Sequence, residues 1–261
     1  MSKGSSFVIF VVILIILFNI LSELLSTEDG IVWTSSDSGS DEIYGLRPLE
    51  NSWPAIGQSP VALANNLLAA NYYVILDGSG SMANQECSGN KSKLDAAKEA
   101  LAVFVAQLPS GSNIGLYVFD AFGRKEVVSL SSGTKDEFLT QVNNAVSGSG
   151  TPLYSSVVAG YEALKRQAGA QLGYGEYHLV VVTDGEANDG EDPRPAVKRL
   201  LQESPVQLHT IGFCIGDRHS LNQPGLVDYR AADDPQSLAR SLEAVLAEAP
   251  KFDVGSFKEV K

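Results

Sequence analysis

From Asn71 onward, short continuous apolar runs alternate with amphipathic segments, and this alternation restricts the possible folds more than any other feature of the sequence. The runs at 72–76 and 178–183 consist mostly of large apolar side chains, as expected for parallel strands that are covered on both faces. Between them, residues 93–108 place their apolar side chains at helical spacing. Strands and helices that alternate in this way predict a doubly wound sheet.

The predicted fold class is therefore α/β: a Rossmann-like, doubly wound, mostly parallel sheet with helices on both faces. The strand at 125–130 is expected to be an edge hairpin partner, and Pro152 is expected to occupy the first helical position of its helix. The expected strands are 72–76, 114–119, 125–130, 178–183, 206–214 and 227–231, and the expected helices are 93–108, 135–146, 152–167, 195–202 and 236–248.

Two of these strands run directly into an aspartate. Asp77 follows the first strand, and Asp184 follows the strand at 178–183. An unpaired carboxylate at the end of a buried strand is costly, and in this kind of sheet ligands bind at the carboxyl ends of the strands. Ser79 and Ser81 add two hydroxyls at alternate positions of a glycine-rich turn. Hard oxygen donors of this kind suit Mg²⁺.

The segment Asp77-Gly78-Ser79-Gly80-Ser81 resembles the Asp-x-Ser-x-Ser signature of the metal-ion-dependent adhesion site (MIDAS) in von Willebrand factor A domains. Thr151, in a loop before a predicted helix, and Asp184 match the two other ligand positions of that family. The resemblance extends over about residues 71–248, and no ligand position departs from the pattern. It implies direct ligation by Ser79, Ser81 and often Thr151, while the aspartates act directly or through water.

The same resemblance implies metal-dependent protein binding, in adhesion, scaffolding or assembly, rather than catalysis. The expected ion is Mg²⁺, with Mn²⁺ or Ca²⁺ as alternatives, and an open coordination position would take a carboxylate from a protein partner. Bacterial relatives often work beside AAA+ ATPases, so such a system is a further expected partner. The alternative is a metal-dependent hydrolase or phosphoryl-transfer enzyme, which would need a positioned base and a deep pocket.

Each candidate ligand also has a purely structural interpretation. Ser79 and Ser81 are common turn residues. Thr151 is suited to capping a helix, and Asp184 to making a turn. Because independent turn residues need not converge on one strand-end face of the sheet, the joint pattern favours the metal site.

The amino-terminal segment predicts a membrane anchor. Residues 7–18 are an unbroken run of Phe, Val, Ile and Leu, and as a helix residues 7–25 would span about 28 Å, close to the hydrocarbon thickness of a bilayer. We expect an uncleaved transmembrane helix within residues 1–25, a cytoplasmic amino terminus and a domain on the periplasmic side of a bacterial inner membrane. The alternative is a cleaved signal peptide and a secreted, soluble binder.

The rest of the chain divides by composition. Residues 26–65 read as an acidic flexible linker rich in Ser, Gly and Asp, residues 66–250 as the von Willebrand factor A-like domain, and residues 251–261 as a carboxyl-terminal tail. The net charge of −12 argues against a nucleic-acid partner, because phosphate binding needs clustered Lys and Arg.

Cys87 and Cys214 are too few for a thiolate metal site, but both are expected at the edge of the sheet that carries the candidate ligands. In an oxidising compartment they would be able to form a disulfide bond. The alternative is a buried Cys214 that acts as a small apolar residue and a free Cys87 on a loop. The sequence leaves these two states open.

Overall fold

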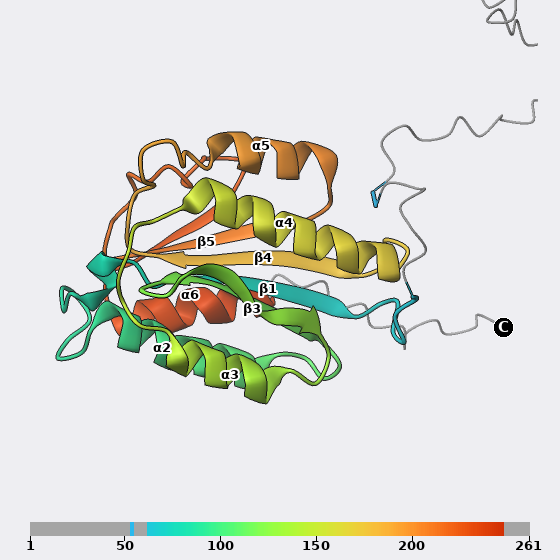
Figure 1. Ribbon diagram of the computed structural model, residues 1–261, viewed down its shortest axis with the longest axis horizontal. Coiled ribbons are helices and arrows are strands. Elements are labelled where there is room, and N and C mark those ends of the chain that lie inside the picture. Colours follow the sequence, from blue (N-terminus) through green and yellow to red (C-terminus); the bar gives the residue numbers. More distant parts are fainter. Residues whose placement is uncertain (1–52, 55–61, 248–261) are drawn as a thin grey trace, which may run out of the picture. The chain divides into compact units, whose positions relative to one another are not determined.

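The structure is a computed structural model that describes residues 53–54 and 62–247 (Figure 1). The expected anchor at 1–25, the tail at 251–261 and most of the linker lie outside these residues. Within the described ranges, no helix is both long enough and apolar enough to cross a membrane.

A six-stranded sheet with the order β3-β2-β1-β4-β5-β6 forms the centre of the domain. All neighbouring strands are parallel except β2 and β3, which form an antiparallel pair at one edge, as the hairpin prediction required. The strands are β1 (Ala70–Asp77), β2 (Asn113–Asp120), β3 (Gly123–Ser131), β4 (Glu176–Thr183), β5 (Gln207–Phe213) and β6 (Asp228–Ala232).

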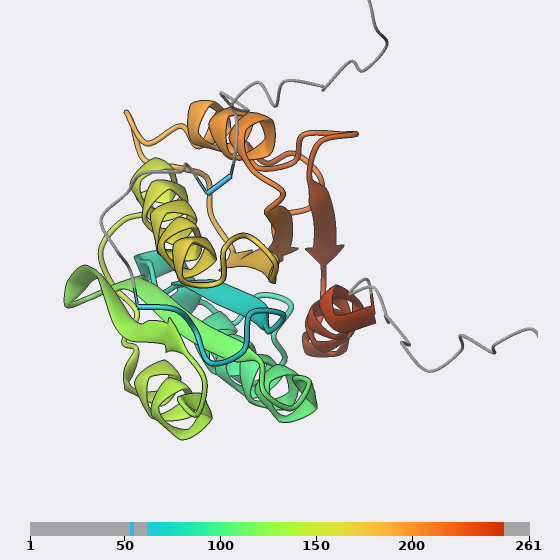
Figure 2. The ribbon, with the colours of Figure 1, turned by 90° about the vertical axis from the view of Figure 1, so that its right-hand side faces the viewer.

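Helices cover both faces of this sheet (Figures 1 and 2). One face carries α2 (Lys93–Gln107), α3 (Lys135–Asn144) and α6 (Pro235–Ala247), and the other carries α4 (Leu153–Ala170) and α5 (Arg194–Glu203). Along β1, Tyr72 and Val74 pack into the first core while Tyr73 and Ile75 pack into the second. This alternation follows from the two-residue period of a strand and explains why β1 is apolar throughout. The prediction of a mostly parallel α/β sheet is confirmed.

Two local predictions differ from the structure. Pro152, expected at the first helical position, is instead the N-cap residue of α4, which begins at Leu153. A short 3₁₀ helix, η1 (Gly80–Ala83), follows β1 where the sequence predicted only a loose turn. So short an element carries no measurable hydrophobic period, so periodicity alone did not reveal it.

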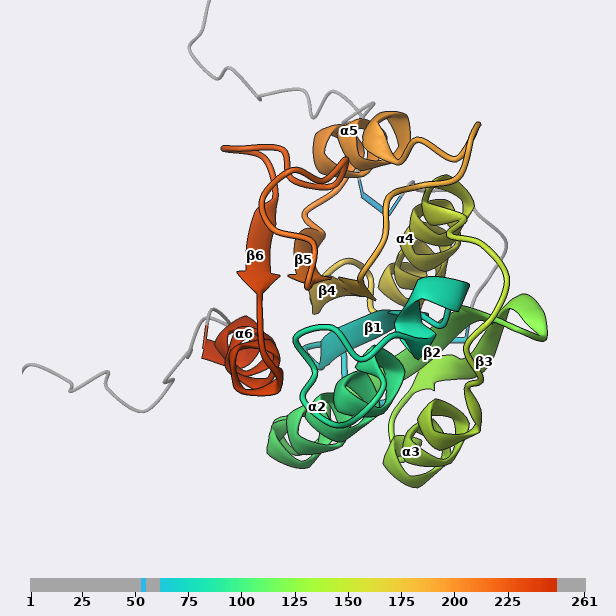
Figure 3. The same cartoon turned by 90° about the vertical axis from the view of Figure 1, so that its left-hand side faces the viewer.

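The strand order positions the candidate site. The chain leaves β1 toward β2 on one side, and β4 pairs with β1 on the other side, so the order of strands reverses between β1 and β4. Such a reversal opens a crevice at the carboxyl ends of the two strands. Figure 3 views this edge, where η1 and the loop leading into α4 lie around the end of β1.

Candidate functional site

Asp77 is the last residue of β1 and is completely buried. Its Oδ1 accepts a hydrogen bond from the backbone N–H of Ser79 at 2.7 Å, and its Oδ2 accepts one from the Thr183 hydroxyl at 2.5 Å. Burial nevertheless raises the pKa of Asp77 to about 6, against the lowering effect of these hydrogen bonds, and the charge of Asp184 adds to the rise. The carboxylate is therefore only partly compensated by the protein around it.

The hydroxyls of the β1 turn connect Asp77 with the end of β4. Ser79 Oγ lies 3.0 Å from Ser81 Oγ, and Ser81 Oγ donates a hydrogen bond to Asp184 Oδ1 at 2.7 Å. The side chain of Asp184 is fully buried. Two serines and two aspartates from two strand ends are thus brought together, as the sequence predicted.

Thr151 approaches the same point from a third segment, the loop before α4. A Cβ atom added at Gly185 would lie 3.4 Å from Thr151 Oγ1 and 3.5 Å from Ser81 Oγ. The two hydroxyls therefore flank one position directly beside Asp184. All five predicted residues lie at this edge of the sheet.

Backbone hydrogen bonds fix the Thr151 loop against the β1 turn. The N–H of Gly80 donates to the carbonyl of Ser149 at 3.1 Å, and the N–H of Gly148 donates to the carbonyl of Gly78 at 2.8 Å. The position of Thr151 relative to Ser79 and Ser81 is thus set by main chain on both sides.

The donor set fits a hard divalent cation. It offers two carboxylates and three hydroxyls, which are the oxygen types that Mg²⁺, Mn²⁺ and Ca²⁺ take. In the part of the chain that the structure describes, no three His, Cys, Asp or Glu side chains group to hold a metal ion. A cation at this edge would therefore depend on the hydroxyl oxygens as well as on the carboxylates.

Sequence reasoning missed Lys93, the first residue of α2. Its Nζ lies 2.9 Å from Asp184 Oδ2 and 3.6 Å from Glu86 Oε2, and its side chain is 4% exposed. A lysine side chain is ordinarily expected to be exposed to solvent. Lys93 nevertheless lies one helical turn before the buried Ala97, on the same face of α2. This position on the apolar face could have indicated that Lys93 is buried.

Asn188, in the loop after β4, is a second residue that the sequence did not suggest. Its side-chain oxygen accepts a hydrogen bond from the N–H of Thr151 at 3.0 Å, and its own N–H donates to the carbonyl of Thr151 at 3.0 Å. This paired contact holds the Thr151 loop to the segment that carries Asp184.

Cys87 and Cys214 form a disulfide bond, with their Cα atoms 6.1 Å apart. The structure thus decides between the two states that the sequence left open. Cys87 lies in the loop between η1 and α2, and Cys214 follows β5, which is separated from β1 by β4. The bond fixes the loop that carries Glu86 beside the candidate site.

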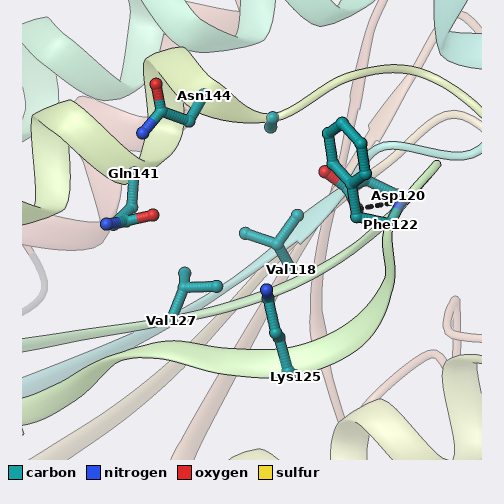
Figure 4. A pocket seen from close by; sticks show the side chains of 8 residues that line it. Val118, Asp120, Phe122, Lys125, Val127, Gln141 and Asn144 are labelled. Atoms are coloured by element: carbon teal, nitrogen blue, oxygen red, sulfur yellow. Dashed lines mark hydrogen bonds between the residues drawn. The ribbon is translucent and has the colours of Figure 1, made fainter.

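A pocket of about 140 Å³ lies at the β2–β3 hairpin, next to α3 (Figure 4). Asp120 shapes the hairpin tip by accepting a hydrogen bond from the N–H of Phe122, a side chain that is largely exposed. None of the five candidate ligands lines this pocket. Its lining residues are Val118, Asp120, Phe122, Lys125, Val127, Gln141, Asn144 and Ala145.

Comparisons with known proteins identify the family and the fold of the chain. The sequence model of the von Willebrand factor type A domain matches residues 71–243. The uncharacterized protein YwmC of Bacillus subtilis (strain 168) is 28% identical in an alignment 157 residues long, which covers 55% of this chain and 66% of YwmC. The chain thus matches just under two thirds of the length of that relative.

Two solved structures share the fold. Proximal thread matrix protein 1 from the mussel byssus, with a zinc-occupied MIDAS motif, aligns with a TM-score of 0.54 at 20% identity, over 69% of this chain and 47% of that protein. An aerotolerance-related membrane protein from Bacteroides fragilis, carrying multiple mutations to serines, aligns with a TM-score of 0.54 at 15% identity, over 69% of this chain and 99% of that protein. Because the family match covers most of the chain, the protein belongs to the von Willebrand factor type A domain family.

Proposed function

We propose that this domain binds a divalent metal ion, with Mg²⁺ as the expected ion, and binds a protein partner through it. The observation that carries the proposal is the convergence of oxygen-bearing side chains from three separate segments at one edge of the sheet. The residues proposed to hold the ion are Asp77, Ser79, Ser81, Thr151 and Asp184.

Each group of ligands has a distinct part in this proposal. The aspartates supply negative charge, and the hydroxyls supply neutral oxygens on short side chains that are fixed by main-chain contacts. The bound ion would act as a Lewis acid and could accept one further oxygen ligand from another molecule. A carboxylate of the partner protein is the matching hard ligand.

We further propose an adhesion, scaffold or assembly role rather than catalysis. The match to the von Willebrand factor type A domain family and the likeness to a thread matrix protein support this class of function. The family resemblance favours a setting in a multi-protein system at a membrane, beside an AAA+ ATPase.

Thr151→Ala is expected to weaken Mg²⁺ binding at least tenfold while the fold stays intact, because a small oxygen site loses its geometry with any ligand whereas the sheet core lies elsewhere. Calorimetric titration of the purified chain with Mg²⁺, together with melting curves with and without chelator, measures the effect. Thr140→Ala, the same change on the exposed face of α3, is the matched control. The proposal fails if the wild-type chain shows neither heat nor a thermal shift with Mg²⁺, Mn²⁺ or Ca²⁺.

We also propose that the apolar segment at 7–25 anchors the chain, with the amino terminus in the cytoplasm and the domain on the periplasmic side. The support is the sequence pattern alone, since this segment lies outside the described residues. The chain should pellet with membranes, resist carbonate extraction and begin at or near Met1. An isolated chain that begins within residues 23–27 would instead identify a cleaved signal and a secreted protein.

A further inference from the structure

Lys93 occupies a place that is unfavourable for a lysine on two counts. Its ammonium group is almost completely buried, and burial penalises a charge. It also stands in the first turn of α2, where the positive end of the helix dipole favours acidic side chains such as Asp95. A lysine at this position is therefore costly unless a partner offsets its charge.

The contacts of Lys93 show what offsets this cost. Asp184 Oδ2 lies 2.9 Å from the ammonium nitrogen, and both side chains are buried. Glu86 lies at 3.6 Å, but its side chain is 76% exposed, so solvent screens most of its interaction. Asp184 is therefore the principal partner of Lys93.

The carboxylate of Asp184 accepts hydrogen bonds from two neighbouring side chains. Its Oδ1 accepts the hydroxyl of Ser81, which is a candidate metal ligand, while its Oδ2 accepts the ammonium group of Lys93. With Asp77 and Asp184 ionised and Lys93 protonated, the site carries a net charge of about one negative unit rather than two. A divalent cation would then leave a net positive charge, which attracts a carboxylate.

We infer that Lys93 is a built-in counter-charge of the metal site: it weakens cation binding and leaves the loaded site positive, so that an acidic partner residue binds. This inference rests on the proposed function and adds a determinant of metal affinity and partner class to it. Lys93 acts here through Asp184 and is a positioning residue rather than a ligand.

Lys93→Met tests the inference, because it removes the charge and keeps most of the side-chain length. The purified full chain is titrated with Mg²⁺ by calorimetry, and the Mg²⁺-loaded chain is then titrated with acetate as a probe for a partner carboxylate. We expect Mg²⁺ to bind at least tenfold more tightly and acetate at least threefold more weakly than in the wild type. A residue with a purely structural role would not tighten metal binding when it is removed.

Lys91→Met is the matched control, since it removes the same charge two residues away from a side chain that is 48% exposed. It should leave the Mg²⁺ affinity within about twofold of wild type, because solvent screens that charge. Lys93→Arg keeps the charge and should stay close to wild type. If Lys93→Met does not fold, Lys93→Gln keeps an N–H donor without the charge and should show the same tightening.

The outcomes separate this inference from the proposed function. A wild type that binds Mg²⁺ and a folded Lys93→Met or Lys93→Gln variant that binds it no more tightly would overturn the inference and leave the metal site standing. No Mg²⁺ binding by wild type or by any folded variant would overturn both. Tighter binding by the Lys93 variants but not by Lys91→Met would support the counter-charge.

Discussion

Asp77→Asn is expected to abolish Mg²⁺ binding and, at the same time, to stabilise the metal-free protein. Asparagine keeps the shape of the side chain but removes the charge that a cation needs. The raised pKa of Asp77, about 6 against an ordinary value of 3.8, corresponds to a penalty of about 3 kcal/mol for the ionised form at neutral pH. Removing the charge should therefore raise the free energy of unfolding by about 2–3 kcal/mol in the absence of metal.

The stability gained by Asp77→Asn should increase with pH. Because folding raises the pKa of Asp77, the wild-type protein is most stable when this carboxyl is neutral. That stability is fully present below pH 3.8 and is lost as the pH rises through about 6. The advantage of Asp77→Asn should thus fall below about 1 kcal/mol near pH 4 and be complete above pH 7. Urea unfolding of the metal-free chain between pH 4 and pH 7.5, with Mg²⁺ calorimetry at the upper value, measures both effects.

Asp136→Asn, an exposed aspartate in the first turn of α3, is the control and should change stability by only a few tenths of a kcal/mol. An Asp77→Asn chain that still binds Mg²⁺ with wild-type affinity would remove Asp77 from the ligand set. A variant less stable than wild type at pH 7.5 would show that burial of the charge is compensated within the fold.

Replacing Cys87 and Cys214 together by serine is expected to lower the free energy of unfolding by about 3–5 kcal/mol. The bond joins residues 127 positions apart, and so long a cross-link removes much conformational freedom from the unfolded chain. Urea unfolding of oxidised wild type and of the double variant measures the loss. Thiol counting in denaturant without reductant should find no free thiol in protein from an oxidising compartment.

Reductant provides the internal control for this prediction. It should destabilise the wild type to about the level of the double variant and leave the double variant unchanged. Two free thiols per wild-type chain, or an unfolding midpoint that reductant does not move, would contradict the bond and its contribution. Mg²⁺ titration of the double variant would further show whether the clamped loop beside the site affects metal binding.

The fold class and most of the candidate ligands could be predicted from the sequence, because both depend on local patterns. The apolar run that ends in Asp77 predicted a buried central strand, and the alternation of strands and helices predicted the parallel sheet. Asp77, Ser79, Ser81 and Asp184 lie at or just after strand ends, where ligands gather in such a sheet, whereas Thr151 was expected only from the family resemblance. The residues that identify each of these strands and motifs lie within a few positions of one another in the sequence.

The residue pairs that are distant in sequence could not be predicted and are seen in the folded domain alone. Lys93 and Asp184 are 91 residues apart in sequence, and their contact depends on how the start of α2 is set against the end of β4. The partnership of Asn188 with Thr151 and the bond between Cys87 and Cys214 are of the same kind. Local propensity and periodicity report the environment of one segment, whereas a specific pairing follows from strand order and helix packing. These set the distance between segments, and through it they fix the charge at the site.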